Sequence, residues 1–272
     1  FTLLDHVVRY PLWEGAVSHL FYAQRLYQLP LGVFGASLAT AIFPQMSIDA
    51  AQRDFAALRQ SISSGMRGTV FVALPATVGL LLISRPVIAV ILERGEFHPS
   101  DTEKTAVALA FYSLGLTGYF AQQVLARAFY ALQEPGVPAR TAVVAVLAGL
   151  VLNLLLVWPL GSGGLAAATA ISSYLQVAML VVALRRRLGP GVLAGLRRAL
   201  RDTTIATVAM AVAVIGAGHL TSRYTELVGL VLAVATGTTV YLIVARLLHI
   251  EMLSLFTGKG RHTSDLSADR NL

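Results

Sequence analysis

One arginine stands alone in a long apolar stretch near the start of the chain. Arg25 is the only Lys, Arg, Asp or Glu residue between Gly15 and Pro44. A cation that deep in an apolar helix costs several kcal/mol unless it faces water or an anion. A guanidinium group stays charged at any relevant pH and binds phosphate oxygens in a bidentate manner. The sequence therefore predicts that Arg25 binds an anion, and a diphosphate suits it best.

Polar side chains accompany Arg25 at helical spacing. Tyr22 lies one turn before it, and Gln24 and Gln28 share a neighbouring face. A polar stripe of this kind lines a cavity or packs on another helix, and for Gln28 both alternatives are open. Arg25 itself has the alternative of snorkelling to the nearer interface. We expect substrate contacts from Arg25, Tyr22 and Gln28.

The other polar residues in apolar segments favour packing over ligand binding. Asn153 is expected to form an interhelical hydrogen bond, and Arg127 to anchor a helix at the interface. The same packing role is expected for a cluster of small and polar residues further along: Ser172, Ser173, Tyr174 and Gln176.

No set of residues indicates an enzyme, a cofactor or a metal site. Glu93, Glu96 and His98 lack firm ligand spacing, and the chain has no cysteine to supply thiolates. The glycines of Gly161–Gly164 lack the lysine of a phosphate-binding loop. No carboxylate interrupts the apolar segments, so a carboxylate proton relay is not expected. We expect no catalytic residue, no cofactor and no metal.

The composition is that of a membrane protein. The 272 residues are 56% hydrophobic and 13% charged, with a mean hydropathy of +0.70, whereas soluble domains carry about 25% charged residues. The net charge of +7 sits mainly in short loops between apolar segments, which argues against a nucleic-acid partner. We therefore expect an all-α polytopic membrane protein.

Seven apolar segments approach the roughly 20 residues that cross a bilayer. The first is long, and Pro30, Gly32 and Gly35 are expected to kink it. Arg85 and Pro86 are expected to end the second helix near Ser84. The seven segments are 16–43, 69–92, 106–126, 141–160, 164–184, 203–220 and 227–248.

The basic residues predict the orientation. Fifteen Lys and Arg residues fall on one side of these segments and five on the other, and the richer side is cytoplasmic. Residues 1–15 are then a lead-in on the outer side, after a helix that the sequence does not include. Residues 251–272 are a cytoplasmic, disordered tail. Ser47–Gly68 is expected to form an amphipathic helix on the inner surface.

Several motifs, in this order, resemble those of the MurJ (MviN) family of lipid II flippases. The resemblance covers residues 16–190 well, and the last two segments match in hydropathy alone. The motifs are YAQRLYQLPLGVFGASLATAIFP at 22–44, LERGEF at 92–97, RAFYALQEPGVPART at 127–141 and NLLLVWPLGSGGLAAA at 153–168.

The resemblance implies a fold and a function. The family has fourteen helices in a MATE-like fold of the multidrug/oligosaccharidyl-lipid/polysaccharide exporter (MOP) superfamily, and this chain would supply helices eight to fourteen. It moves lipid-linked peptidoglycan precursor to the outer leaflet by alternating access, for cell-wall synthesis. Arg25 matches a cavity arginine thought to contact the diphosphate. Relatives often carry an acid where this chain has Gln28.

The resemblance also implies domains, partners and a location. Residues 16–188 would form five spans of the C-terminal lobe, and residues 189–250 two further helices that line a groove for the lipid tail. The partners would be lipid II, membrane lipids and the N-terminal half of the same protein, in the bacterial inner membrane. The alternatives are a flippase for another lipid-linked oligosaccharide and a membrane scaffold that transports nothing.

Overall fold

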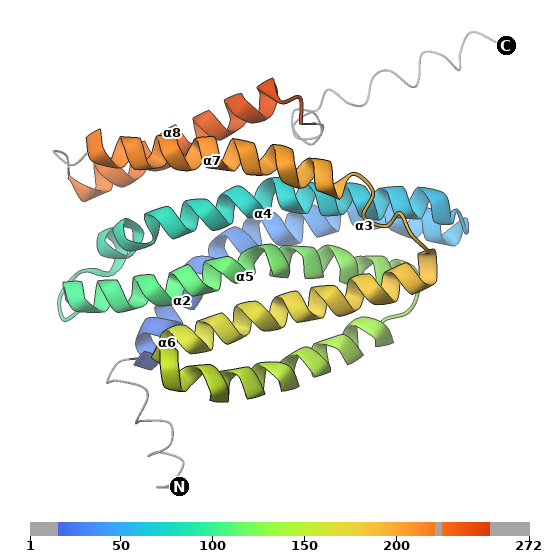
Figure 1. Cartoon of the computed structure of the whole chain (residues 1–272), viewed down its shortest axis with the longest axis horizontal. Coiled ribbons are helices and arrows are strands. Elements are labelled where there is room, and N and C mark those ends of the chain that lie inside the picture. The colour runs from blue at the N-terminus through green and yellow to red at the C-terminus, as the bar shows by residue number, and fades with distance from the viewer. Residues whose placement is uncertain (1–15, 221–224, 251–272) are drawn as a thin grey trace, which may run out of the picture.

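The computed structural model describes residues 16–220 and 225–250, and the described part is an all-helical bundle (Figure 1). The expected lead-in and cytoplasmic tail lie outside the described residues. The elements, in chain order, are α2 (Ala16–Pro30), the π-helical segment η1 (Leu31–Gly35), α3 (Ala36–Ala51), α4 (Phe55–Leu92), α5 (Pro99–Ala131), α6 (Gly136–Leu188), α7 (Leu196–Leu220) and α8 (Glu226–Leu247).

The turn between α3 and α4 corrects one expectation. α3 continues to Ala51, and α4 begins only four residues later, where the Asp54 side chain accepts hydrogen bonds from the backbone N–H groups of Ala56 (3.0 Å) and Ala57 (2.9 Å). This cap sets a sharp turn. Leu58 and Ile62 then lie in the protein core. Ser47–Gly68 is therefore no separate surface helix: it spans the end of α3 and the start of α4, and Leu58 and Ile62 face other helices, whereas Phe55 stays exposed.

The second correction concerns the end of α4. The helix does not stop near Ser84 but runs through Pro86 to Leu92. Proline removes one backbone hydrogen bond, whereas ending the helix inside an apolar layer would expose several unpaired groups. Ile88, two residues beyond the proline, is buried with Leu109 of α5. That packing favours continuing the helix.

The long helix α6 reverses direction at Gly161. Its backbone there has φ 56° and ψ −132°, and the two arms lie side by side in Figure 1. A Cβ atom at Gly164 would collide with the backbone carbonyl group of Leu156, so only glycine fits at that position. Gly161–Gly164 therefore forms the turn between the two arms of α6.

Small residues let α5 and α6 approach closely. A Cβ atom at Gly115 would lie 2.9 Å from the Cα atom of Ala170, and one at Gly118 would collide with the Ser173 side chain. Small residues commonly permit this kind of packing between membrane helices. α5 also contacts α2, α3 and α4, so it lies at the centre of the bundle.

The last two helices pack as a pair against α4 (top of Figure 1). Phe71 of α4, Met210 of α7 and Tyr241 of α8 form their common core. The Tyr241 hydroxyl donates a hydrogen bond to the carbonyl oxygen of Phe71. This pair therefore has its own small core on one side of the bundle.

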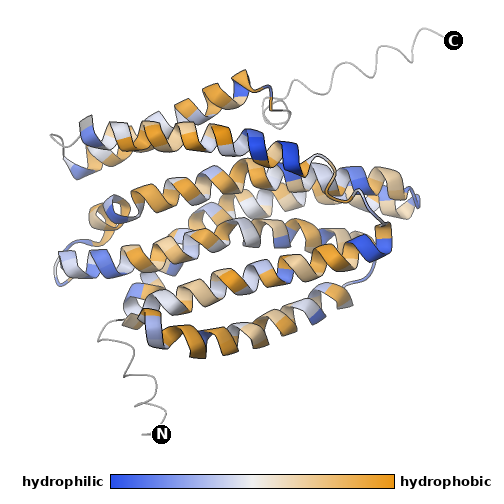
Figure 2. Ribbon diagram, viewed as in Figure 1, coloured by the Kyte–Doolittle hydropathy of each residue, from blue (hydrophilic) through white to orange (hydrophobic). Residues whose placement is uncertain are grey.

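Hydrophobic residues make up most of the length of the helices (Figure 2). On the first arm of α6, Val146 and Leu154 are 62% and 65% exposed, which suits contact with lipid. By length and composition five described helices could cross a membrane: Ala16–Ala51, Phe55–Leu92, Gly136–Leu188, Leu196–His219 and Glu226–Leu247. The expected seven crossings divide α6 in two and include α5, and that number stays a prediction.

The alternating directions of the helices bring most of the basic residues to one end of the bundle. Arg53 lies there in the turn after α3, Arg140 near the start of α6 and Arg187 in its last turn, whereas Arg94 lies in the loop at the opposite end. From the positive-inside rule we expect the arginine-rich end to face the cytoplasm, and this orientation stays a prediction.

We predict that labelling of single cysteines will reproduce this orientation. The chain has no cysteine of its own, and Gln52, Ser100 and Arg186 are exposed. Gln52→Cys and Arg186→Cys should react with an impermeant maleimide only after the membrane is opened, and Ser100→Cys should react in intact cells. Reaction of Gln52→Cys in intact cells would reverse the assignment.

We also predict that Gly115→Val will loosen the contact between α5 and α6. The new side chain must displace the backbone of Ala170, and overpacking of this kind costs about 1–3 kcal/mol. The melting temperature of the purified protein should fall by several degrees. Gly216→Val is the matched control, because no atom lies within 4 Å of a Cβ atom built there. Equal melting temperatures for the two variants would contradict the close approach.

Candidate functional site

The candidate site lies on the face of α2 that turns away from the rest of the bundle. The opposite face is buried against α5, where the Tyr27 ring stacks on Tyr112 with centroids 5.4 Å apart. Tyr22, Gln24, Arg25 and Gln28 are all exposed. The structure therefore brings the three predicted substrate contacts together on one open face, with Arg25 between the other two.

Arg25 has an aromatic neighbour, and its guanidinium group is accessible to a ligand. Its guanidinium carbon lies 5.0 Å from the centroid of the Phe21 ring, one turn earlier, within the range of a cation–π contact. Within residues 16–220 and 225–250, no hydrogen bond or ion pair to a carboxylate is found for Arg25. The cation is thus oriented by an aromatic ring, and its hydrogen-bonding edge is available to an anion.

Tyr22 connects this face to the loop between α4 and α5. Its ring meets the Phe97 ring edge to face, with centroids 5.9 Å apart. Phe97 also contacts the ring of His19, which lies on the buried side of α2. Aromatic contacts to the loop between α4 and α5 therefore hold the N-terminal end of this face in place.

The segment that follows the face departs from α-helical geometry. The π-helical segment Leu31–Gly35 begins directly after Pro30, the position at which a backbone N–H group is lacking. Gly35 is buried, and a Cβ atom there would lie 3.1 Å from the Gln123 side-chain nitrogen, whereas Gly32 has open space around it. Whether Pro30, Gly32 and Gly35 form a hinge in the working protein stays a prediction.

Of the polar residues expected to have packing roles, some make the expected contacts and Asn153 does not. The hydroxyl of Tyr174 donates to the Leu114 carbonyl oxygen (2.7 Å), so it does join two helices as expected. Arg127 lies over the Phe43 ring. In contrast, the buried Oδ1 atom of Asn153 has no hydrogen-bond partner among the described residues. The interhelical hydrogen bond expected there is therefore missing for that oxygen.

Sequence reasoning missed a buried carboxylate. Asp49 is 3% exposed and accepts hydrogen bonds from the side chains of Gln45 (2.7 Å) and Ser61 (2.6 Å). Because α3 extends to Ala51, this carboxylate lies within a helix, beyond the end of the expected apolar segment 16–43. The spacing of Gln45 and Asp49, four residues apart, was the available signal. The contacts fasten α3 to α4.

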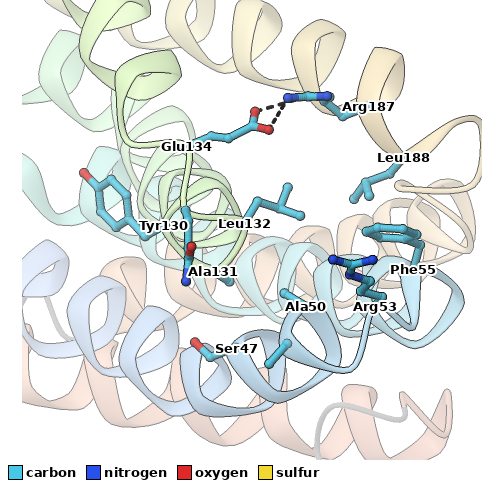
Figure 3. Close-up of a pocket in the computed structure, with 12 residues that line it drawn as sticks. Ser47, Ala50, Arg53, Phe55, Tyr130, Ala131, Leu132, Glu134, Arg187 and Leu188 are labelled. Carbon is cyan, nitrogen blue, oxygen red and sulfur yellow. Dashed lines mark hydrogen bonds and ion pairs between the residues drawn. The ribbon is translucent and has the colours of Figure 1, made fainter.

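A cavity of about 600 Å³ lies at the arginine-rich end of the bundle (Figure 3). Arg53 and Phe55 line one side, and an ion pair between Glu134 and Arg187 closes another, linking the loop before α6 to its last turn. Arg25 lies 28 residues before Arg53, roughly 40 Å along the helix axis at 1.5 Å per residue. This cavity is therefore separate from the candidate site.

Glu93, Glu96 and His98 are the residues considered as metal ligands in the sequence. Among the residues that the structure describes, no three His, Asp or Glu side chains form a group that could hold an ion. The carboxylate of Glu93 instead accepts a hydrogen bond from the Thr102 hydroxyl (2.8 Å). The chemistry of the site is that of a fixed cation with polar and aromatic neighbours, suited to binding an anion.

The chain is similar to one family of membrane proteins over most of its length. The family model described as lipid II flippase MurJ matches residues 3–236. A Vibrio cholerae protein named probable lipid II flippase MurJ is 38% identical over 181 residues, 65% of this chain and 34% of that protein. A Thermotoga maritima protein of the same name is 28% identical over 263 residues, 96% of this chain and 52% of that protein.

A solved structure with a similar fold carries the same family name. It is described as lipid II flippase MurJ in an inward closed conformation, and it shares 26% identity with this chain at a TM-score of 0.75. The match covers 88% of this chain and 48% of the solved one. The chain thus spans between a third and about half of the length of the relatives that it matches.

We predict that Pro30→Ala will stabilise the segment that follows it. An alanine restores a backbone donor and removes the clash with the preceding turn. One added hydrogen bond of about 0.5–1.5 kcal/mol corresponds to roughly two- to tenfold slower amide exchange at Leu31–Gly35. Hydrogen–deuterium exchange by mass spectrometry measures this, with the amides of α5 as the internal control. Unchanged amide exchange in Leu31–Gly35 would show that Pro30 does not cause the π-helical segment.

Proposed function

The chain belongs to the lipid II flippase MurJ family, and we propose that it forms the C-terminal half of a transporter that moves lipid II across the membrane. The observation that carries the proposal is the open cationic face of α2. Arg25 lies at its centre, exposed and free of any described ion pair, on a chain about half as long as its Thermotoga relative. A second lobe placed against this face would enclose the cation in a cavity.

Such a cavity suits a diphosphate-linked lipid. The headgroup must be sheltered from hydrocarbon while it crosses, and Arg25 can bind its diphosphate in a bidentate manner. Tyr22 and Gln28 then supply neutral hydrogen-bonding groups on either side. No covalent bond has to form or break, so the proposed activity is transport and not catalysis. Rocking of the two lobes about the site would expose it to each leaflet in turn.

The lipid tail needs a separate, apolar path. A cavity of about 560 Å³ opens between the end of α4 and the α7–α8 pair. Leu82, Pro86, Val214 and Leu230 contribute its apolar lining, beside the charged residues Arg85, Glu93 and Glu226. Val212 and Val231 are among the exposed apolar residues of α7 and α8. We propose that residues 189–250 form the groove that holds the polyprenyl tail.

The location and the partners follow from the same proposal. The chain spans the bacterial cytoplasmic membrane with its C-terminus inside, consistent with the gathering of arginines at one end of the bundle. Its partners are lipid II, the surrounding lipids and the N-terminal half of the transporter. Its product, lipid II in the outer leaflet, serves cell-wall synthesis.

We predict that Arg25→Ala, made in a full-length transporter that contains this chain, will abolish complementation of a flippase-depleted strain. Losing one charge-assisted contact of about 1.5–3 kcal/mol lowers the affinity by roughly one to two orders of magnitude. Arg25→Lys should also be poor, because an ammonium cannot reproduce a planar bidentate contact. Transport of lipid II into the outer leaflet is the direct measurement.

Arg140→Ala is the matched control, since Arg140 is an exposed arginine at the start of α6. It should transport normally. A snorkelling role for Arg25 gives the opposite result, because lysine snorkels as well as arginine. Wild-type transport by Arg25→Ala would show that Arg25 is an interface anchor, and a scaffold would equally tolerate the change.

A further inference from the structure

A third cavity lies one turn from Arg25, at the start of α2. It measures about 420 Å³ and opens where α2 meets the loop from α4 to α5. Its lining combines rings with polar groups, namely Ser18, His19, Tyr22, Arg94, Phe97 and Asp101. Apolar walls with a few converging polar groups are typical of sites for small organic ligands.

His19 supplies a hydrogen-bonding atom that the protein leaves unused. The residue is 4% exposed, and its Nδ1 atom lies 3.1 Å from the hydroxyl of Thr105 in α5. Its Nε2 atom is buried and has no hydrogen-bond partner among the described residues; the carboxylate oxygen of Asp101 lies 3.6 Å away, beyond a good hydrogen bond. Buried polar atoms usually have partners, so this nitrogen marks a place for a ligand group.

The chemistry around His19 selects the kind of ligand group. Whichever neutral tautomer Thr105 favours, a hydroxyl can serve as donor or acceptor to Nε2. Asp101 and Glu96 carry negative charge at the same cavity, and Arg94 and the nearby Lys104 carry positive charge. The two carboxylates accept hydrogen bonds from hydroxyl and amide groups, whereas a phosphate diester offers them no donor.

The aromatic walls add a second requirement. Phe97 meets the Tyr22 ring and the His19 ring edge to face, with centroids 5.9 and 6.3 Å apart. Such walls pack against the C–H faces of a ring that also carries hydroxyls. A sugar meets both requirements.

The position of the cavity links it to the anion site. Tyr22 lines the cavity, and Arg25 follows Tyr22 by one helical turn, roughly 4.5 Å along the axis. A ligand whose diphosphate lies on Arg25 can therefore place an attached sugar against His19. We propose that this cavity binds the sugar next to the diphosphate of the transported lipid, with Nε2 of His19 bonded to a sugar hydroxyl or amide. The inference rests on the proposed function.

Comparing two lipids distinguishes binding of the sugar from binding of the diphosphate. Native mass spectrometry of a full-length transporter that contains this chain, purified in detergent, can compare lipid II with undecaprenyl diphosphate, which has the same tail and diphosphate but no sugar. We expect His19→Phe, which keeps the ring, to weaken binding of lipid II about five- to tenfold through the loss of one hydrogen bond. Binding of undecaprenyl diphosphate should stay within twofold of wild type.

Two further variants complete the test. His249→Phe is the matched control, because His249 is exposed and lies beyond the end of α8; it should bind both lipids normally. Phe97→Leu removes an aromatic wall and should also weaken binding of lipid II alone, which keeps the proposal testable if His19→Phe fails to fold. Melting temperatures report folding for each variant.

The outcomes distinguish this inference from the proposed function. If wild type binds the two lipids equally, or if folded His19→Phe or Phe97→Leu binds lipid II like wild type, the sugar site is wrong. If Arg25→Ala leaves binding of undecaprenyl diphosphate unchanged, the diphosphate site fails instead. Loss of both lipids in His19→Phe would show a general disturbance of α2 and would also overturn the sugar site.

Discussion

In an apolar surrounding, a backbone group without a hydrogen bond costs several kcal/mol, and the architecture of the chain depends on this constraint. It explains why α4 continues through Pro75 and Pro86, since one lost bond costs less than a broken helix. It also explains where the chain does change direction. α6 reverses at Gly161, at the end of the bundle that also holds the loop between α4 and α5.

The same constraint acts on side chains and separates structural polar groups from functional ones. Asp49 is buried but accepts two hydrogen bonds, so its role is to join α3 and α4. Arg25 has no described ion pair, and Nε2 of His19 has no hydrogen-bond partner in the described part of the chain. Both lie on or beside one open face of α2. These two groups therefore lie where a ligand and a second lobe would meet, whereas other unsatisfied atoms, such as Oδ1 of Asn153, lie elsewhere in the bundle.

The sequence predicted the helices best where apolar length alone decides them. The expected segments 203–220 and 227–248 lie within or nearly within α7 and α8. It failed where packing outweighs local signals: Pro86 does not end α4, because burial of Ile88 favours the helix, and Ser47–Gly68 packs inward. Arg25 stood out because charge is rare in apolar segments. His19 did not, because only the contacts of α2 with α5 show that one ring nitrogen lacks a partner.

The π-helical segment Leu31–Gly35 has a rotational consequence. Ala23 and Ala39 are both buried, yet sixteen residues of uninterrupted α-helix would place them about 160° apart around the axis. A π-helical turn absorbs one extra residue, which reduces this difference to about 60°. α2 and α3 can thus bury the same side of one long helix. Regular α-helical winding of the same residues would turn Arg25 by about 100° relative to α3, so the direction in which the cation points depends on the π-helical segment.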